Sequence, residues 1–148
     1  MSLLYGDEFK GEVSLSGKDY CFYSLFRNNT KLNNAKNISL PATTLVDGCY
    51  GHMFEGCALL NTIVCRASSG FNKNKVMENW TLNVAASGTY VKSSDKPIAE
   101  YPTGASGIPT GWTVSDDVLL YAPEISFDGE TIEIDCDTEG AAIYYRLN

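Results

Sequence analysis

A 28-residue repeat near the start of the chain sets narrow limits on the fold. The block CFYSLF, which begins at Cys21, recurs as CYGHMF from Cys49, and the match extends to a Leu-Asn pair after each block. Apolar residues fall at positions i, i+4 and i+5 of each block, which predicts a short helical turn or two. A unit this small cannot bury its own apolar face, so stacked units must share one core.

Strand-like runs separate these blocks, at residues 12–15, 37–40, 62–65 and 88–91. They begin roughly every two dozen residues, the range expected of leucine-rich repeats. We therefore predict an α/β solenoid of about four coils over residues 1–116. It should have a narrow, mostly parallel strand ladder and short helices on the other side. Within its core, Phe26 should stack with Phe54, and Leu32 with Leu60.

The second repeat carries the string LPATTLxxxCYxxMFEGCxxL, which runs from Leu40 to Leu60. It resembles the BspA-like leucine-rich repeats of surface proteins from gut Bacteroidetes. The opening segment 2–11 and the closing segments 79–80, 88–92 and 107–114 are also similar, so the resemblance covers about residues 2–116. It implies a right-handed coil, display on the cell surface and a closing segment. Trp80 and Trp112 lie where such a solenoid must be closed, which predicts a role in its cap.

Composition changes after residue 116, and we assign residues 117–122 to a linker and 123–148 to a β fragment. The run Glu124 to Phe127 ends at Asp128-Gly129, a strong hairpin signal, and residues 131–136 alternate between apolar and polar. The fragment resembles the start of a chitobiase C-terminal-like Ig module, in Pro123, Gly129, Gly140-Ala141 and residues 143–146. A whole sandwich needs about seven strands and roughly 100 residues. We therefore expect a truncated module whose strands could self-associate with another chain or pack on the solenoid end.

Charge and hydropathy limit the classes of partner and the cellular locations that are expected for this chain. A net charge of -7 argues against nucleic acid, which requires clustered Lys and Arg. No stretch approaches the roughly 20 apolar residues of a membrane span, and no signal-peptide pattern opens the chain. Such a chain is either cytoplasmic or a mature or excised form; the family resemblance favours an extracellular, cell-surface location.

The five cysteines cannot all pair within one chain, and no CxxC motif occurs. Cys49, Cys57 and Cys65 lie eight residues apart, a spacing that could indicate a metal or redox cluster. The favoured interpretation is buried free thiols that act as small apolar core residues.

Other polar residues give no catalytic constellation. Adjacent carboxylates such as Asp116 and Asp117 point to opposite sides of an extended chain, so a solvated linker is expected there. His52 has no accompanying nucleophile motif, which predicts a surface histidine. Calcium would need oxygens such as those of Asp128, Asp135 and Asp137, but the EF-hand spacing is missing and a solvated strand edge is favoured. We accordingly predict neither enzymatic activity nor a metal or cofactor.

The sequence therefore predicts a non-catalytic binding or adhesion module on the cell surface, which presents its repeat surface to host proteins or glycans. Strand positions that point away from the core would form the binding face; the candidates are Asn37, Ser39, Thr62 and Val64. The alternative is an accessory region, for substrate binding or spacing, of a larger glycan-degrading surface enzyme.

Overall fold

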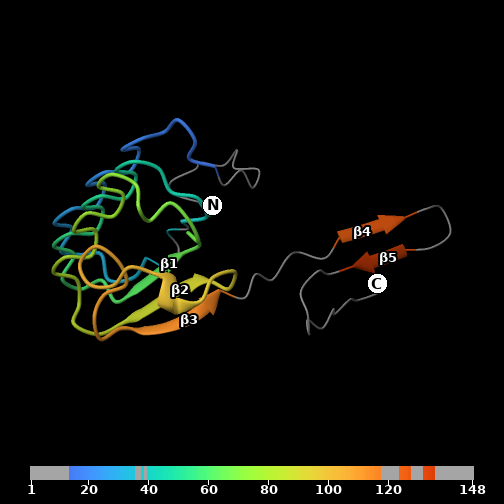
Figure 1. Ribbon diagram of the computed structural model, residues 1–148. Coiled ribbons are helices and arrows are strands. Elements are labelled where there is room, and N and C mark those ends of the chain that lie inside the picture. Colours follow the sequence, from blue (N-terminus) through green and yellow to red (C-terminus); the bar gives the residue numbers. More distant parts are fainter. Residues whose placement is uncertain (1–13, 36–37, 39, 118–123, 128–131, 136–148) are drawn as a thin grey trace. The chain divides into compact units, whose positions relative to one another are not determined.

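The computed structural model describes residues 14–35, 38, 40–117, 124–127 and 132–135. The chain divides into two compact units, Met1–Asp117 and Val118–Asn148 (Figure 1). Of the predicted strand at 12–15, only Ser14 and Leu15 are described, and neither is in a strand; of the one at 37–40, only Ile38 and Leu40 are described.

Unit 1 contains a parallel three-stranded sheet in the order β1 (Thr62–Cys65), β2 (Thr89–Ser93) and β3 (Thr113–Asp117). The register joins Thr62 to Thr89 and Thr89 to Thr113. A single parallel bridge from Leu40 to Cys65 continues the pairing on the far side of β1. The predictions of strands at 62–65 and 88–91 are thus confirmed, while β3 was not predicted from the sequence.

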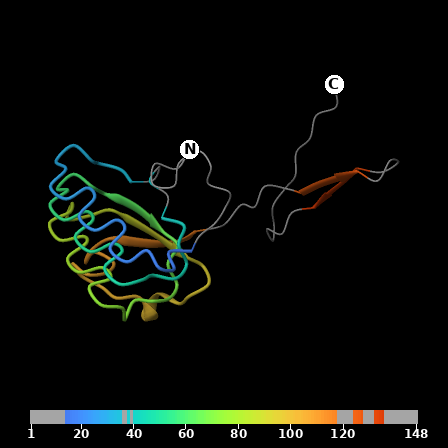
Figure 2. The ribbon, with the colours of Figure 1, turned by 90° about the horizontal axis from the view of Figure 1, so that it is seen from above.

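Opposite the sheet, three turn segments lie one on another: the first (residues 20–28), the second (48–56) and the third (74–83) (Figures 1 and 2). Every second N–H group of the first segment donates to a carbonyl of the second, over 2.7–3.1 Å. The second segment donates to the third in the same way, over 2.7–3.0 Å. The intervening N–H groups close turns three residues back, as Tyr23 does to Tyr20 and Leu25 to Phe22.

The short helices predicted for these segments are wrong. In the described residues the only helix is a single turn of 3-10 helix, η1 (Ile98–Glu100). An α-helix requires each N–H group to donate to the carbonyl four residues earlier. Here alternate N–H groups donate instead to carbonyls of the neighbouring segment. Every fourth residue also has a positive φ, at positions 20, 24 and 28, then 48, 52 and 56, then 75, 79 and 83. Residues in that left-handed region interrupt a right-handed helix.

The core fills the space between the sheet and the turn segments, and a stack of aromatic rings runs through it. Phe26 and Phe54 are nearly parallel, 5° apart with ring centroids separated by 5.8 Å, as predicted. Trp80 is fully buried against Phe54, Tyr50 and Tyr90, at centroid distances of 5.9, 6.1 and 6.3 Å. Fully burying one large apolar side chain contributes about 1.5–3 kcal/mol, so this stack is a main source of stability.

The first turn segment is less buried than its repeat predicts. Cys49 and Met53 are completely buried, yet their counterparts Cys21 and Leu25 are exposed, Leu25 by 48%. Leu60 is buried, while Leu32 is only partly buried against the core. Equivalent sequence therefore gives unequal burial, because the second segment is covered on both sides by neighbouring segments.

Unit 2 contributes a two-stranded antiparallel sheet of β4 (Glu124–Phe127) and β5 (Ile132–Asp135). Its register pairs Glu124 with Asp135 and Phe127 with Ile132, which confirms the two predicted strands. The Asp128-Gly129 turn and residues 136–148 lie outside the described residues. Pairing of these terminal strands with another chain stays a prediction.

Candidate functional site

The sheet of unit 1 has a buried inner face and a half-exposed outer face. Ile63, Cys65 and Tyr90 point inward and are fully buried. The alternate residues Thr62 and Val64, both predicted for the binding face, are only half-buried, as expected for residues on the opposite side of the strand. The other two candidates, Asn37 and Ser39, lie outside the described residues.

Strand register arranges the outer face into two rows. One row is Thr62, Thr89 and Thr113; the other is Val64, Val91 and Ser115. Exposure increases toward β3, where Thr113 and Ser115 are exposed. These six uncharged side chains, which we call the outer rows, combine hydroxyl groups with methyl groups at strand spacing. Parallel sheets are usually covered on both faces, so a half-exposed face is a candidate contact surface.

Sequence reasoning found only one strand of this face. The tripeptides Thr62-Ile63-Val64, Thr89-Tyr90-Val91 and Thr113-Val114-Ser115 share a threonine, then an apolar residue, then a small residue. That signal could have identified β2 and β3 as further contributors to the outer rows.

At the carboxyl end of the strands, a buried lysine is held by carbonyl and carboxylate oxygens. The Lys92 ammonium donates to the carbonyls of Ser93 and Lys96, at 3.0 and 2.7 Å, and pairs with the Asp116 carboxylate. Asp116 and Asp117 thus belong to β3, which corrects their assignment to a solvated linker. The three N–H donors of the ammonium are matched by three oxygen acceptors, so we assign this cluster a structural role.

On the turn segments, His52 lies within a network of charged side chains. Its Nδ1 contacts the Glu55 carboxylate, its Nε2 lies 3.5 Å from Glu78, and its ring packs edge-on against Tyr23. Arg27 bonds Glu55 over 2.8 Å. The His52 side chain is 15% exposed, so this histidine is partly buried among charged neighbours. Hydrogen bonding to His52 and Arg27 lowers the pKa of Glu55.

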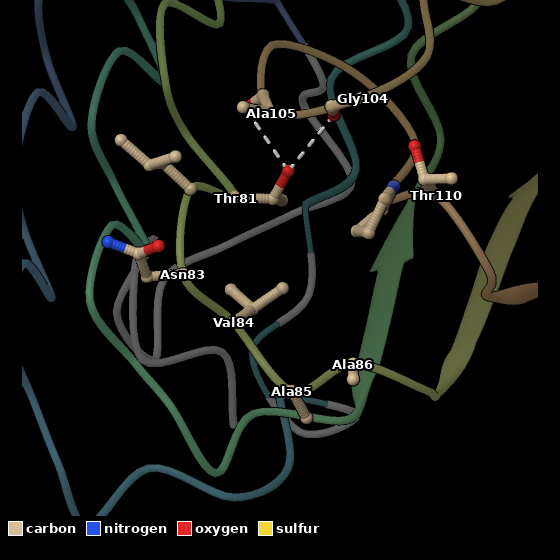
Figure 3. A pocket seen from close by; sticks show the side chains of 10 residues that line it. Thr81, Asn83, Val84, Ala85, Ala86, Gly104, Ala105 and Thr110 are labelled. Carbon is tan, nitrogen blue, oxygen red and sulfur yellow. Dashed lines mark hydrogen bonds between the residues drawn. The ribbon is translucent and has the colours of Figure 1, made fainter.

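A shallow pocket of about 230 Å³ lies beside the third turn segment (Figure 3). Its walls include Val84, Ala85, Ala105 and Pro109, which are small and uncharged. The Thr81 hydroxyl donates within the protein, to the carbonyls of Ala105 and Gly104 at 3.1 and 3.4 Å (Figure 3). A ligand in this pocket would therefore be recognised mainly by its shape, because the walls offer few free polar groups.

Cys49, Cys57 and Cys65 are free and buried, which confirms them as core thiols. The Cys57 thiol donates to the Phe26 carbonyl, and so links the second turn segment to the first. No group of three or more His, Cys, Asp or Glu side chains in the described ranges is arranged to hold a metal ion. Asp135 lies in β5, whereas Asp128 and Asp137 fall outside those ranges.

Thiol alkylation should distinguish these cysteines. At pH 8, iodoacetamide should modify Cys21 in the native protein much faster than Cys49, since burial raises the pKa of the Cys49 thiol to about 12 and leaves almost no thiolate. Peptide mapping by mass spectrometry, with Cys136→Ser as background, measures the rates. All four remaining cysteines should react in urea. Equal native rates for Cys21 and Cys49 would contradict the described core.

None of the helical structure in the described part of the chain has the length and apolar character to cross a bilayer. Comparison with protein-family models, with curated proteins and with solved structures finds no match for this chain.

Proposed function

We propose that this chain is a non-catalytic binding module that presents the outer rows of its sheet to a partner at a cell surface. The half-exposed outer face carries the proposal. Its Thr and Ser hydroxyls can donate and accept hydrogen bonds, and its Val and Thr methyl groups can be covered by an apolar surface. The partner class is a protein or a carbohydrate.

A leucine-rich-repeat solenoid is the architecture that we propose for unit 1. Three features support it: the parallel sheet, the 28-residue sequence repeat, and the hydrogen-bond ladder between successive turn segments. Solenoids expose extended faces that bind partners, which fits the outer rows. Surface display is proposed from the resemblance to BspA-like proteins.

Substitution at the centre of the face tests this function. Thr89 lies on the middle strand, so Thr89→Lys should place a charge among the outer rows and weaken binding at least about tenfold, or ~1.4 kcal/mol. Thr30→Lys introduces the same charge at an exposed position of a turn and should leave binding unchanged. Glycan and host-protein arrays would identify the ligand, and titration of that ligand would give the affinities.

The arrays also separate adhesion from the accessory role in a glycan-degrading enzyme. Binding to proteins alone favours adhesion, whereas binding to polysaccharide alone favours the accessory role. Equal loss of binding in Thr30→Lys and Thr89→Lys would refute the outer rows as the site. Hydrolysis of a glycan by the purified chain would refute the non-catalytic proposal.

A further inference from the structure

The stack of turn segments has a direction, because its hydrogen bonds all run one way. N–H groups of the first segment donate to the second, and those of the second donate to the third. Each internal junction is therefore a row of donors facing a row of acceptor carbonyls, spaced at every second residue. The two ends of the stack must then differ in chemistry, with donors at one end and carbonyls at the other.

The donor end, on the third segment, is covered by the loop at residues 102–109. The Asn79 N–H donates to the Ser106 hydroxyl over 3.0 Å, and the Thr81 N–H donates to the Ala105 carbonyl over 3.0 Å. The Trp80 indole N–H adds a bond to the Gly107 carbonyl, over 2.8 Å. This loop therefore supplies acceptors where a fourth turn segment would have supplied carbonyls.

The acceptor end, on the first segment, has no such cover within the described part of the chain. The carbonyls of residues 19, 21, 23, 25 and 27 accept no hydrogen bond from any described residue, whereas those of 47, 49, 51, 53 and 55 each accept one from the first segment. The adjoining side chains of Cys21 and Leu25 are exposed, while their counterparts Cys49 and Met53 are buried. We call this carbonyl row, with Cys21 and Leu25, the open end.

We propose that the open end is a docking surface for a segment of a partner polypeptide that donates an N–H group at every second residue and lays apolar side chains over Leu25. The second turn segment shows the chemistry that fits, since its equivalent surface is covered by such a row. A second copy cannot use the same end, because carbonyls would face carbonyls, and the donor end is capped by its own loop. This surface is distinct from the outer rows, so either proposal can fail alone.

A peptide taken from the chain itself tests the docking. The probe is a synthetic peptide of residues 46–60, whose N–H groups at 48, 50, 52, 54 and 56 form this kind of row in the protein. Biolayer interferometry of the immobilised peptide against the full chain should show saturable binding. Leu25→Asp should weaken it about tenfold or more, since a carboxylate would be desolvated at the contact. Leu59→Asp alters a leucine of similar exposure (55%, against 48% for Leu25) on a different segment and should not change the affinity.

Two further measurements make the test decisive. Both Asp variants should melt within a few degrees of the parent, because both leucines are exposed. N-methylation of the peptide at Tyr50, His52 and Phe54 removes donors of the row and should abolish binding. The proposal is overturned if the full chain does not bind the peptide, if the N-methylated peptide binds equally well, or if Leu59→Asp weakens binding as much as Leu25→Asp. A dimer that dissociates in Leu25→Asp would assign the end to a second copy and overturn it as well.

Discussion

Gly107→Ala should destabilise unit 1 by about 3 kcal/mol or more, the upper range for overpacking a close-packed site. A Cβ atom at this position would lie 2.1 Å from the Pro102 carbonyl oxygen and 2.2 Å from its carbon. Both are backbone atoms, which cannot swing aside as a flexible side chain could. The loop is also pinned at that point, because the Ile108 N–H donates to the same Pro102 carbonyl over 2.8 Å.

Urea unfolding followed by circular dichroism measures this loss. Gly17→Ala is the matched control, since Gly17 has a φ of +72° but nothing within 4 Å of an added Cβ. It should cost only about 1 kcal/mol, the conformational penalty of a side chain in the left-handed region. If the two substitutions cost the same, the close approach of Gly107 to Pro102 is absent in solution.

Trp80→Ala should cost about 4–5 kcal/mol, because it removes the largest of the fully buried side chains and leaves a cavity. Trp80 is completely buried and packs against three aromatic rings. Its indole N–H also donates to the Gly107 carbonyl, which joins the core to the 102–109 loop. The expected result is a large fall in the free energy of unfolding in urea.

Trp112→Ala provides the comparison for this substitution. Trp112 is 7% exposed and makes an indole bond of the same length, 2.8 Å, to the Ala85 carbonyl. Among the described residues it makes none of the aromatic ring contacts that Trp80 makes, so its removal should cost about 2–3 kcal/mol. A Trp112→Ala loss equal to or greater than that of Trp80→Ala would contradict the central position of Trp80. Because Trp80 bonds Gly107, the losses from Trp80→Ala and Gly107→Ala should not add.

Features of the fold that depend on a local sequence pattern could be predicted from the sequence. The 28-residue repeat predicted the stacking of Phe26 on Phe54, and the Asp128-Gly129 turn signal predicted that β4 ends at Phe127. Prediction failed for the turn segments, because apolar spacing at i, i+4 and i+5 does not distinguish a helix from turns whose N–H groups bond the next segment. Asp116 was misassigned because its partner Lys92 lies 24 positions earlier and meets it only through the pairing of β2 with β3.

For the candidate site, the sequence identified Thr62 and Val64 as outward positions of a strand. It could not place Thr89, Val91, Thr113 and Ser115 beside them, since register depends on how the intervening residues fold. The charged network of Arg27, Glu55, His52 and Glu78 was likewise invisible, because its members come from three different turn segments.

The stacking of the repeated units follows from the amino-acid sequence, because each repeat carries more apolar surface than it can bury alone. Which copy is covered and which is exposed depends on the tertiary fold. Burial and backbone hydrogen bonding depend on neighbours supplied by distant parts of the chain. Cys21 and Cys49 occupy the same place in the repeat, and only the position of each segment in the stack makes one thiol accessible and the other buried.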